Sequence, residues 1–230
     1  MLFRSGKTFK TMKYLYTRGE VTGPMIAAAG NFFDALGSEV EAHQQAMVER
    51  LSTDIATANG GSNDFTGILY QITTDSDMYT ANGGPGAVID ASSAYLSLNW
   101  IDKAIDEAMD VGMMGSGTPN TIVTTRKVAR MINSLLQSQQ QFVNQTEIAA
   151  GFRVPTYDGL AIVVDNHWQD DSKILIFDRN KATLLVHQDF TYEELAKTKD
   201  SVDFMMKWYG GFILEGSASL LENFTLTPNI

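Results

Sequence analysis

The sequence predicts an α+β fold in which helices flank an antiparallel sheet. Two features point to this class: a long helical pattern near the start of the chain and a series of short β-prone segments in its second half. Hydrophobic residues make up 44% of the 230 residues. That is enough apolar surface for a real core in one large or two small domains.

The first 22 residues combine basic and apolar side chains without helical spacing. The basic residues are Arg4, Lys7, Lys10, Lys13 and Arg18. Apolar and aromatic residues are interleaved with them, and this pattern favours extended β-structure that faces solvent. Because the segment has no obvious core of its own, we expect it to form an arm that packs on something else.

A long helix is predicted directly after this arm. Thr22 can cap it and Pro24 suits its first turn. Apolar residues then recur at spacings of three, four and seven, at Phe33, Leu36, Val40, Met47, Leu51 and Ile55. Asn59-Gly60-Gly61 is a C-terminal stop. Thirty-odd residues would make a rod of roughly 50 Å, although Gly30 and Gly37 are places where it would kink or break.

The rest of the chain is predicted to alternate between strands and helices. We expect, in order, a strand at 65–72, a loop at 73–86, a helix at 93–111, a strand at 121–125 leading into a third helix, and a polar loop at 137–145. Further strands are predicted at 152–155, 160–165, 173–177 and 183–188, with a final pair at 207–214 and 219–226.

Composition excludes several classes of protein. The chain has no cysteine, so disulfides and thiolate metal sites are ruled out. Its net charge of -10 is the opposite of the general basic surface that binds nucleic acid. It contains neither an apolar run of ~18 residues nor a signal-peptide pattern, so we expect no membrane partner.

No catalytic set emerges from the motifs. Arg4-Ser5-Gly6-Lys7-Thr8 resembles the end of a phosphate-binding loop, but Met1 stands where its first glycine is required. His43, His167 and His187 are scattered, and none has a second ligand at helical spacing. We therefore predict no catalytic, cofactor-binding or metal-binding residues and no enzyme. The alternative is a hydrolase or ligand-binding domain with Asp165 and His167 in a cleft.

Three stretches, in this order, resemble a known family. They are 54–61 with 65–69, then 101–112 with 120–130, and finally 157–165 with 173–178. Together they are similar to the major capsid proteins of tailed bacteriophages and related archaeal viruses, which have the Hong Kong 97 fold. The likeness spans nearly the whole chain and rests on the order and spacing of the segments.

This resemblance implies a division of the chain. Residues 1–22 would be the extended E-loop, 23–159 the peripheral domain with the long spine helix, and 160–201 the axial domain. Residues 202–230 would be closing strands, mostly of the peripheral domain. Contacts between subunits would run through the basic residues of the arm, namely Arg4, Lys7, Lys10, Lys13 and Arg18.

The resemblance also implies a function. The chain would be a major capsid protein that assembles with itself, as hexamers and pentamers, into an icosahedral shell around the double-stranded DNA of a tailed virus. Portal, scaffold or decoration proteins would be further partners. The protein would be part of the virion and be assembled in the host cytoplasm. An encapsulin-type shell around cargo proteins is the alternative of the same fold.

Overall fold

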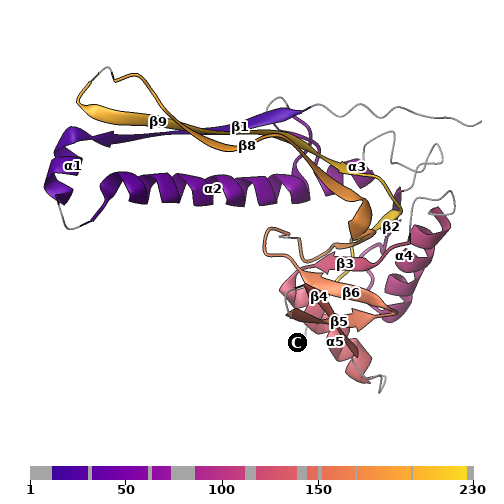
Figure 1. Cartoon of the computed structure of the whole chain (residues 1–230). Helices are drawn as coiled ribbons and strands as arrows, with labels where there is room; N and C mark the ends of the chain where they lie inside the picture. The colour runs from indigo at the N-terminus through magenta and orange to yellow at the C-terminus, as the bar shows by residue number, and fades with distance from the viewer. Residues whose placement is uncertain are drawn as a thin grey trace, which may run out of the picture. The chain divides into compact units, whose positions relative to one another are not determined.

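The computed structural model describes residues 12–30, 33–61, 64–73, 86–111, 118–138, 144–149, 152–168, 170–197 and 199–226 (Figure 1). The chain divides into two compact units. The first consists of Met1–Gly67 and Leu184–Phe212, and the second of Ile68–Thr183 and Ile213–Ile230. Among the described residues, no helix is both long and apolar enough to cross a membrane.

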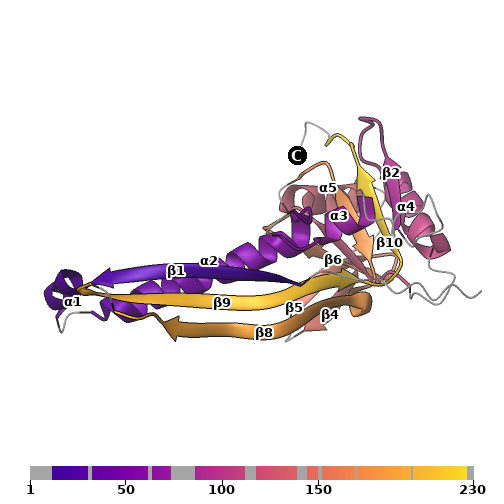
Figure 2. The same cartoon turned by 90° about the horizontal axis from the view of Figure 1, so that it is seen from above.

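The first unit is a long helix against a three-stranded sheet. The strands are β1 (Lys13–Thr22), β8 (Ala182–Glu194) and β9 (Ser201–Leu214), in the order β1-β9-β8 (Figure 2). β1 runs antiparallel to β9, from Lys13 opposite Gly210 to Thr22 opposite Ser201. α2 (Ala35–Thr57) packs along β1. Phe204, Met206 and Trp208 of β9 are buried in this unit.

The predicted continuous helix is in fact two helices. α1 (Gly23–Ala29) ends at Gly30, whose φ of 50° and ψ of -126° leave the helical region, and α2 begins five residues later. Asp34 caps α2 by accepting a hydrogen bond from the backbone N–H of Gly37 at 2.9 Å. The prediction of one long rod was therefore wrong, and the break lies at one of the two glycines where the sequence favours it.

α2 buries little of its own surface. Of its 23 residues only five are buried: Ala35, Met47, Leu51, Asp54 and Ala56. Phe33, predicted to begin the apolar stripe, lies outside the helix and is exposed, whereas Val40 and Ile55 are half-buried. Most of this helix therefore presents solvent-accessible side chains.

The second unit is a seven-stranded mixed sheet with helices. Its strand order is β2-β10-β7-β3-β6-β5-β4. The sequence predicted an antiparallel sheet, but the pairs β2–β10 and β3–β6 are parallel, so this sheet is mixed. Its strands are β2 (Gly86–Asp90), β3 (Thr121–Thr124), β4 (Asn144–Ala149), β5 (Phe152–Tyr157), β6 (Leu160–Val164), β7 (Ile174–Phe177) and β10 (Ala218–Glu222). Its helices are α3 (Ile68–Thr73), α4 (Leu98–Val111), α5 (Arg126–Ser138) and a 3-10 turn at Arg179–Lys181.

The core of this unit lies between the sheet and the helices α4 and α5. Ile101 and Ile105 of α4, and Val128 and Ile132 of α5, are fully or almost fully buried in it. They meet apolar side chains from five strands, including Ile89, Ile122, Ile162, Ile174, Ile176 and Leu221. The helical spacing of these residues predicted both helices.

Three further predictions were wrong in part. Residues 68–72 form α3 and not a strand, since Ile68 and Ile72 are one helical turn apart and both buried. The helix predicted to start at Ser93 begins at Leu98. The last two strands do not pair with each other, because β9 pairs with β1 and β8 whereas β10 pairs with β2 and β7.

Part of the predicted arm is a strand of the first unit. Residues 13–22 were predicted as part of an arm without a core of its own, but they form β1, which pairs with β9 of the same chain over its full length. Long-range strand pairing of this kind leaves no local pattern in the sequence. The predicted boundaries after residues 22, 159 and 201 all fall inside the two compact units.

Candidate inter-subunit surface

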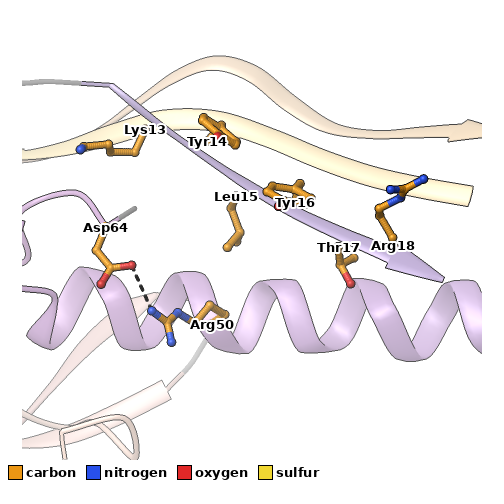
Figure 3. A pocket seen from close by; sticks show the side chains of 8 residues that line it. All are labelled: Lys13, Tyr14, Leu15, Tyr16, Thr17, Arg18, Arg50 and Asp64. Carbon is orange, nitrogen blue, oxygen red and sulfur yellow. Dashed lines mark hydrogen bonds and ion pairs between the residues drawn. The ribbon is translucent and has the colours of Figure 1, made fainter. Parts of the chain in front are cut away.

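β1 carries the two predicted contact residues that the structure describes. Lys13 and Arg18 lie on this strand, whereas Arg4, Lys7 and Lys10 lie outside the described residues. Side chains of β1 alternate between half-buried and exposed positions. Figure 3 shows Leu15 and Thr17 on the side that faces α2, and Tyr14, Tyr16 and Arg18 on the opposite side.

The side of β1 that faces α2 is fixed by specific contacts. The Thr17 hydroxyl and Nδ1 of His43 are hydrogen-bonded at 2.8 Å. His43 in turn meets the ring of Phe204 edge-on, with 5.3 Å between the ring centroids. His43 therefore links the helix to two strands of the sheet. The sequence placed it on the helix but did not indicate these partners.

Arg50 bridges two carboxylates near the end of α2. Its Nε lies 2.9 Å from Oδ1 of Asp54. Its Nη2 donates to Oδ1 of Asp64 at 3.1 Å, as Figure 3 shows. Burial raises the pKa of Asp54, and the Arg50 guanidinium opposes that shift. Sequence analysis missed this cluster, although Arg50 and Asp54 are four residues apart on a predicted helix, where side chains are neighbours.

A groove of about 530 Å³ runs along β1. It is lined by six consecutive residues of the strand, from Lys13 to Arg18, together with Arg50 and Asp64 (Figure 3). Consecutive residues of a strand point to opposite faces. A groove that touches all six therefore lies along the edge of the strand, where its backbone is accessible.

The exposed side of β1 is aromatic. The rings of Tyr14 and Tyr16 stack with 5.7 Å between centroids, and Tyr14 lies 6.1 Å from the ring of Tyr209 on β9. Tyr14 and Tyr16 remain 59% and 55% exposed. Aromatic side chains of this kind are enriched at protein interfaces, where they contribute much contact area.

The Asp165–His167 pair belongs to a local turn of the second unit. Oδ1 of Asp165 lies 3.1 Å from Nδ1 of His167 and also accepts the backbone N–H of His167 at 2.9 Å. Within the described part of the chain, no group of three or more His, Cys, Asp or Glu side chains could hold a metal ion. His187 lies exposed on β8.

Several solved structures share the fold of this chain. The chain is similar to the holo-SrpI encapsulin complex of Synechococcus elongatus PCC 7942 (TM-score 0.72, 11% identity, 93% of this chain and 74% of that chain). It is also similar to the capsid of the native GTA particle (TM-score 0.68, 14% identity, 94% of this chain and 74% of that chain). A third similar structure is that of Microbacterium phage Oxtober96 (TM-score 0.62, 15% identity, 95% of this chain and 73% of that chain). The chain therefore has the Hong Kong 97-like capsid fold, as predicted.

The family follows from the sequence. The model of the SU10 major capsid protein family matches residues 42–215, well over half of the chain, and the chain belongs to that family. It is accordingly a capsid shell protein. No curated protein matches it.

Proposed function

We propose that copies of this chain assemble as hexamers and pentamers into a closed icosahedral shell around the double-stranded DNA of a tailed virus. Closed point-group symmetry ends such assembly at a defined size. The role is structural and not enzymatic, in keeping with a capsid protein family. Portal, scaffold or decoration proteins would be further partners, and assembly would take place in the host cytoplasm.

The observation that carries this proposal is the exposure of the long-helix unit. Five buried residues in a 23-residue helix leave most of α2 accessible, and the aromatic side of β1 is exposed as well. A shell subunit needs several large interfaces, of roughly 2,000 Å² or more for obligate contacts. Contacts with neighbouring copies would use this surface.

We assign the two domain roles to the two compact units. The unit that contains α2 and the sheet β1-β9-β8 takes the peripheral role, because it holds the long helix. The unit with the seven-stranded sheet takes the axial role around the local symmetry axis, because it holds residues 160–183 of the predicted axial segment.

The basic residues of the leading segment would contribute contacts between subunits. Arg18 supports this part of the proposal, because it is exposed and lines the groove along β1. Lys13 lines the same groove and donates to the carbonyl of Gly61 at 3.3 Å. Arg4, Lys7 and Lys10 precede them on the same segment.

A cargo-holding compartment is the second candidate. The similarity to an encapsulin, at a TM-score of 0.72, favours it. The contents of purified particles distinguish the two functions. Nuclease-resistant double-stranded DNA inside particles from a productive infection supports the viral shell. Particles that hold a co-purifying protein and no protected DNA would support the compartment instead.

A further inference from the structure

We propose that β8 of one copy pairs with the open edge of β1 in a second copy, so that their three-stranded sheets join into one. This inference rests on the proposed shell function and specifies one of its contacts. It concerns only strands of the first compact unit.

Both outer strands of the sheet have an open edge. The order β1-β9-β8 gives β1 and β8 the same single partner, β9, among the described residues. The outer edge of each strand therefore presents backbone N–H and C=O groups that no other described strand meets. Such edges pair readily with an extended segment of another chain.

The edge of β1 has room for such a segment. The groove of about 530 Å³ follows it over six residues, and its lining is completed by Arg50 of α2 and by Asp64, which lies beyond the end of that helix. A strand placed there would exchange backbone hydrogen bonds with β1. Its side chains would alternate between the aromatic side, near Tyr14 and Tyr16, and the side of α2.

β8 has the length and the exposed surface to fill this place. It spans 13 residues, against ten for β1. Leu184, Val186 and Tyr192 on it are 39%, 49% and 43% exposed. Long edge strands with exposed apolar side chains are usually protected in proteins that work as monomers. Pairing with another copy would bury these side chains.

The charges of the two strands are complementary. β1 carries Lys13 and Arg18 against one acidic residue, Glu20, which already pairs with Lys199 at 2.6 Å. β8 carries three acidic residues, Asp189, Glu193 and Glu194, and no lysine or arginine. Glu193 pairs with Lys207 of its own chain. Within the described residues Arg18 forms no ion pair, which leaves it to meet Asp189 or Glu194 of the neighbour.

Pairing between two different edges also suits ring formation. A contact of β1 with β8 uses different surfaces on the two partners, and a head-to-tail contact of this kind closes into a ring when the rotation allows. Pairing of β1 with a second β1 would give a two-fold dimer and bring like charges together. The heterologous pairing is therefore favoured.

Disulfide formation between single cysteines tests this pairing, since the chain has no cysteine of its own. One chain would carry Tyr16→Cys. A second, size-tagged chain would carry one cysteine in turn at Leu184, Val186, Asp189, Tyr192 or Glu194, or at Asn99 of α4 as an exposed control. After co-assembly and mild oxidation, the two chains are separated on a non-reducing gel.

We expect at least tenfold more cross-linked heterodimer at one β8 position, or at two on the same face, than at Asn99. The backbones of neighbouring strands lie ~4.7–4.9 Å apart, which is within the Cα–Cα separation that a disulfide spans. Normal particles in which no β8 position exceeds the control would overturn the pairing and leave the shell function intact. If the wild-type chain forms no particles, the proposed shell function is contradicted, and the strand pairing that rests on it is contradicted as well.

Charge reversal gives an independent test. We expect Arg18→Glu to reduce the yield of particles at least tenfold, and the further changes Asp189→Lys and Glu194→Lys in the same chain to restore it. Thermal unfolding of the unassembled variants checks that each still folds. If the triple variant assembles no better than folded Arg18→Glu, the charges of these strands do not face each other and the pairing is rejected.

Discussion

Gly19 of β1 lies directly opposite Phe204 of β9, and the phenyl ring occupies the space that a larger residue at position 19 would need. A Cβ atom at position 19 would lie 2.2 Å from Cζ of Phe204 and 2.9 Å from Nε2 of His43. The absence of a side chain on Gly19 thus lets the aromatic ring and the imidazole pack between the sheet and α2. This contact makes β1 an integral part of the first compact unit.

Replacing this glycine should loosen the sheet. We predict that Gly19→Ala lowers the free energy of unfolding by about 1–3 kcal/mol, because Phe204 and His43 must move out of their present packing. Denaturant unfolding of the unassembled chain measures the change. Arg18→Thr, at an exposed position of the same strand, is the matched control and should be close to neutral in the unassembled chain. Equal stability of the two variants would contradict the described packing.

Arg50 should stabilise the buried carboxylate of Asp54. We expect Arg50→Met to lower the free energy of unfolding by about 1–2 kcal/mol at pH 7. The loss stays modest because the Arg50 side chain is itself largely exposed. Arg126→Met, at an exposed position of α5, serves as the control.

The cost of Arg50→Met should shrink at lower pH. Burial raises the pKa of Asp54, and loss of the guanidinium would raise it further above the unfolded value. The folded variant then binds more protons than the unfolded chain, so the contribution of Asp54 to stability increases as pH falls through the folded pKa. Unfolding curves at pH 7 and near pH 4 test this. A penalty that is unchanged or larger at the lower pH would be inconsistent with a buried charged Asp54.

The charged carboxylate of Asp171, unlike that of Asp54, should stabilise the fold. Its carboxylate accepts hydrogen bonds from Nζ of Lys127 at 2.6 Å and from Oγ1 of Thr125 at 2.7 Å, and these bonds lower its pKa. We predict that Asp171→Asn costs about 0.5–1 kcal/mol at pH 7, a modest loss because the pair is partly exposed. The stability that the charge contributes is present above the unfolded pKa and is lost as pH falls through the folded pKa.

The difference in the free energy of unfolding between Asp171→Asn and wild type should therefore become smaller as pH falls. Asp106→Asn, on the exposed side of α4, is the control and should differ little from wild type at either pH. Unfolding free energies measured from pH 7 downwards give the test. A difference between Asp171→Asn and wild type that stays constant over this range would show that the ion pair does not contribute.

Two truncations should separate the leading segment into parts with different roles. Removal of residues 1–11, with Arg4, Lys7 and Lys10, should reduce shell formation. Removal of residues 1–18 should also lower stability, because it deletes Lys13–Arg18 of β1 from the sheet. Circular dichroism melts and particle yield are the two measurements. Normal shells from the shorter deletion would refute a contact role for these three residues.

Local patterns in the sequence predicted local elements of the fold. The spacing of Ile101 with Ile105 and of Val128 with Ile132 identified α4 and α5, and the β-branched run at Thr121 identified β3. Short apolar runs were ambiguous, and so Ile68–Ile72 was taken for a strand. The pairing of strands could not be predicted, because partners such as Lys13 and Gly210 are separated by almost the entire length of the chain.

The candidate surface was predicted only in outline. The basic character of residues 1–22 predicted contacts between subunits there, because charge can be read from the sequence directly, and this remains a prediction. The groove, the open edges of β1 and β8 and the stacked pair Tyr14–Tyr16 depend on the order β1-β9-β8. No local pattern specifies that order, which explains why these features emerged only from the structure.

Self-assembly into a closed shell is tested most directly by electron microscopy of the purified protein at assembly concentrations. The account predicts closed particles of uniform diameter with five-fold and local six-fold clusters of subunits. A chain that remains monomeric under all such conditions, with the β1 and β8 edges and the α2 surface exposed to solvent, would contradict it.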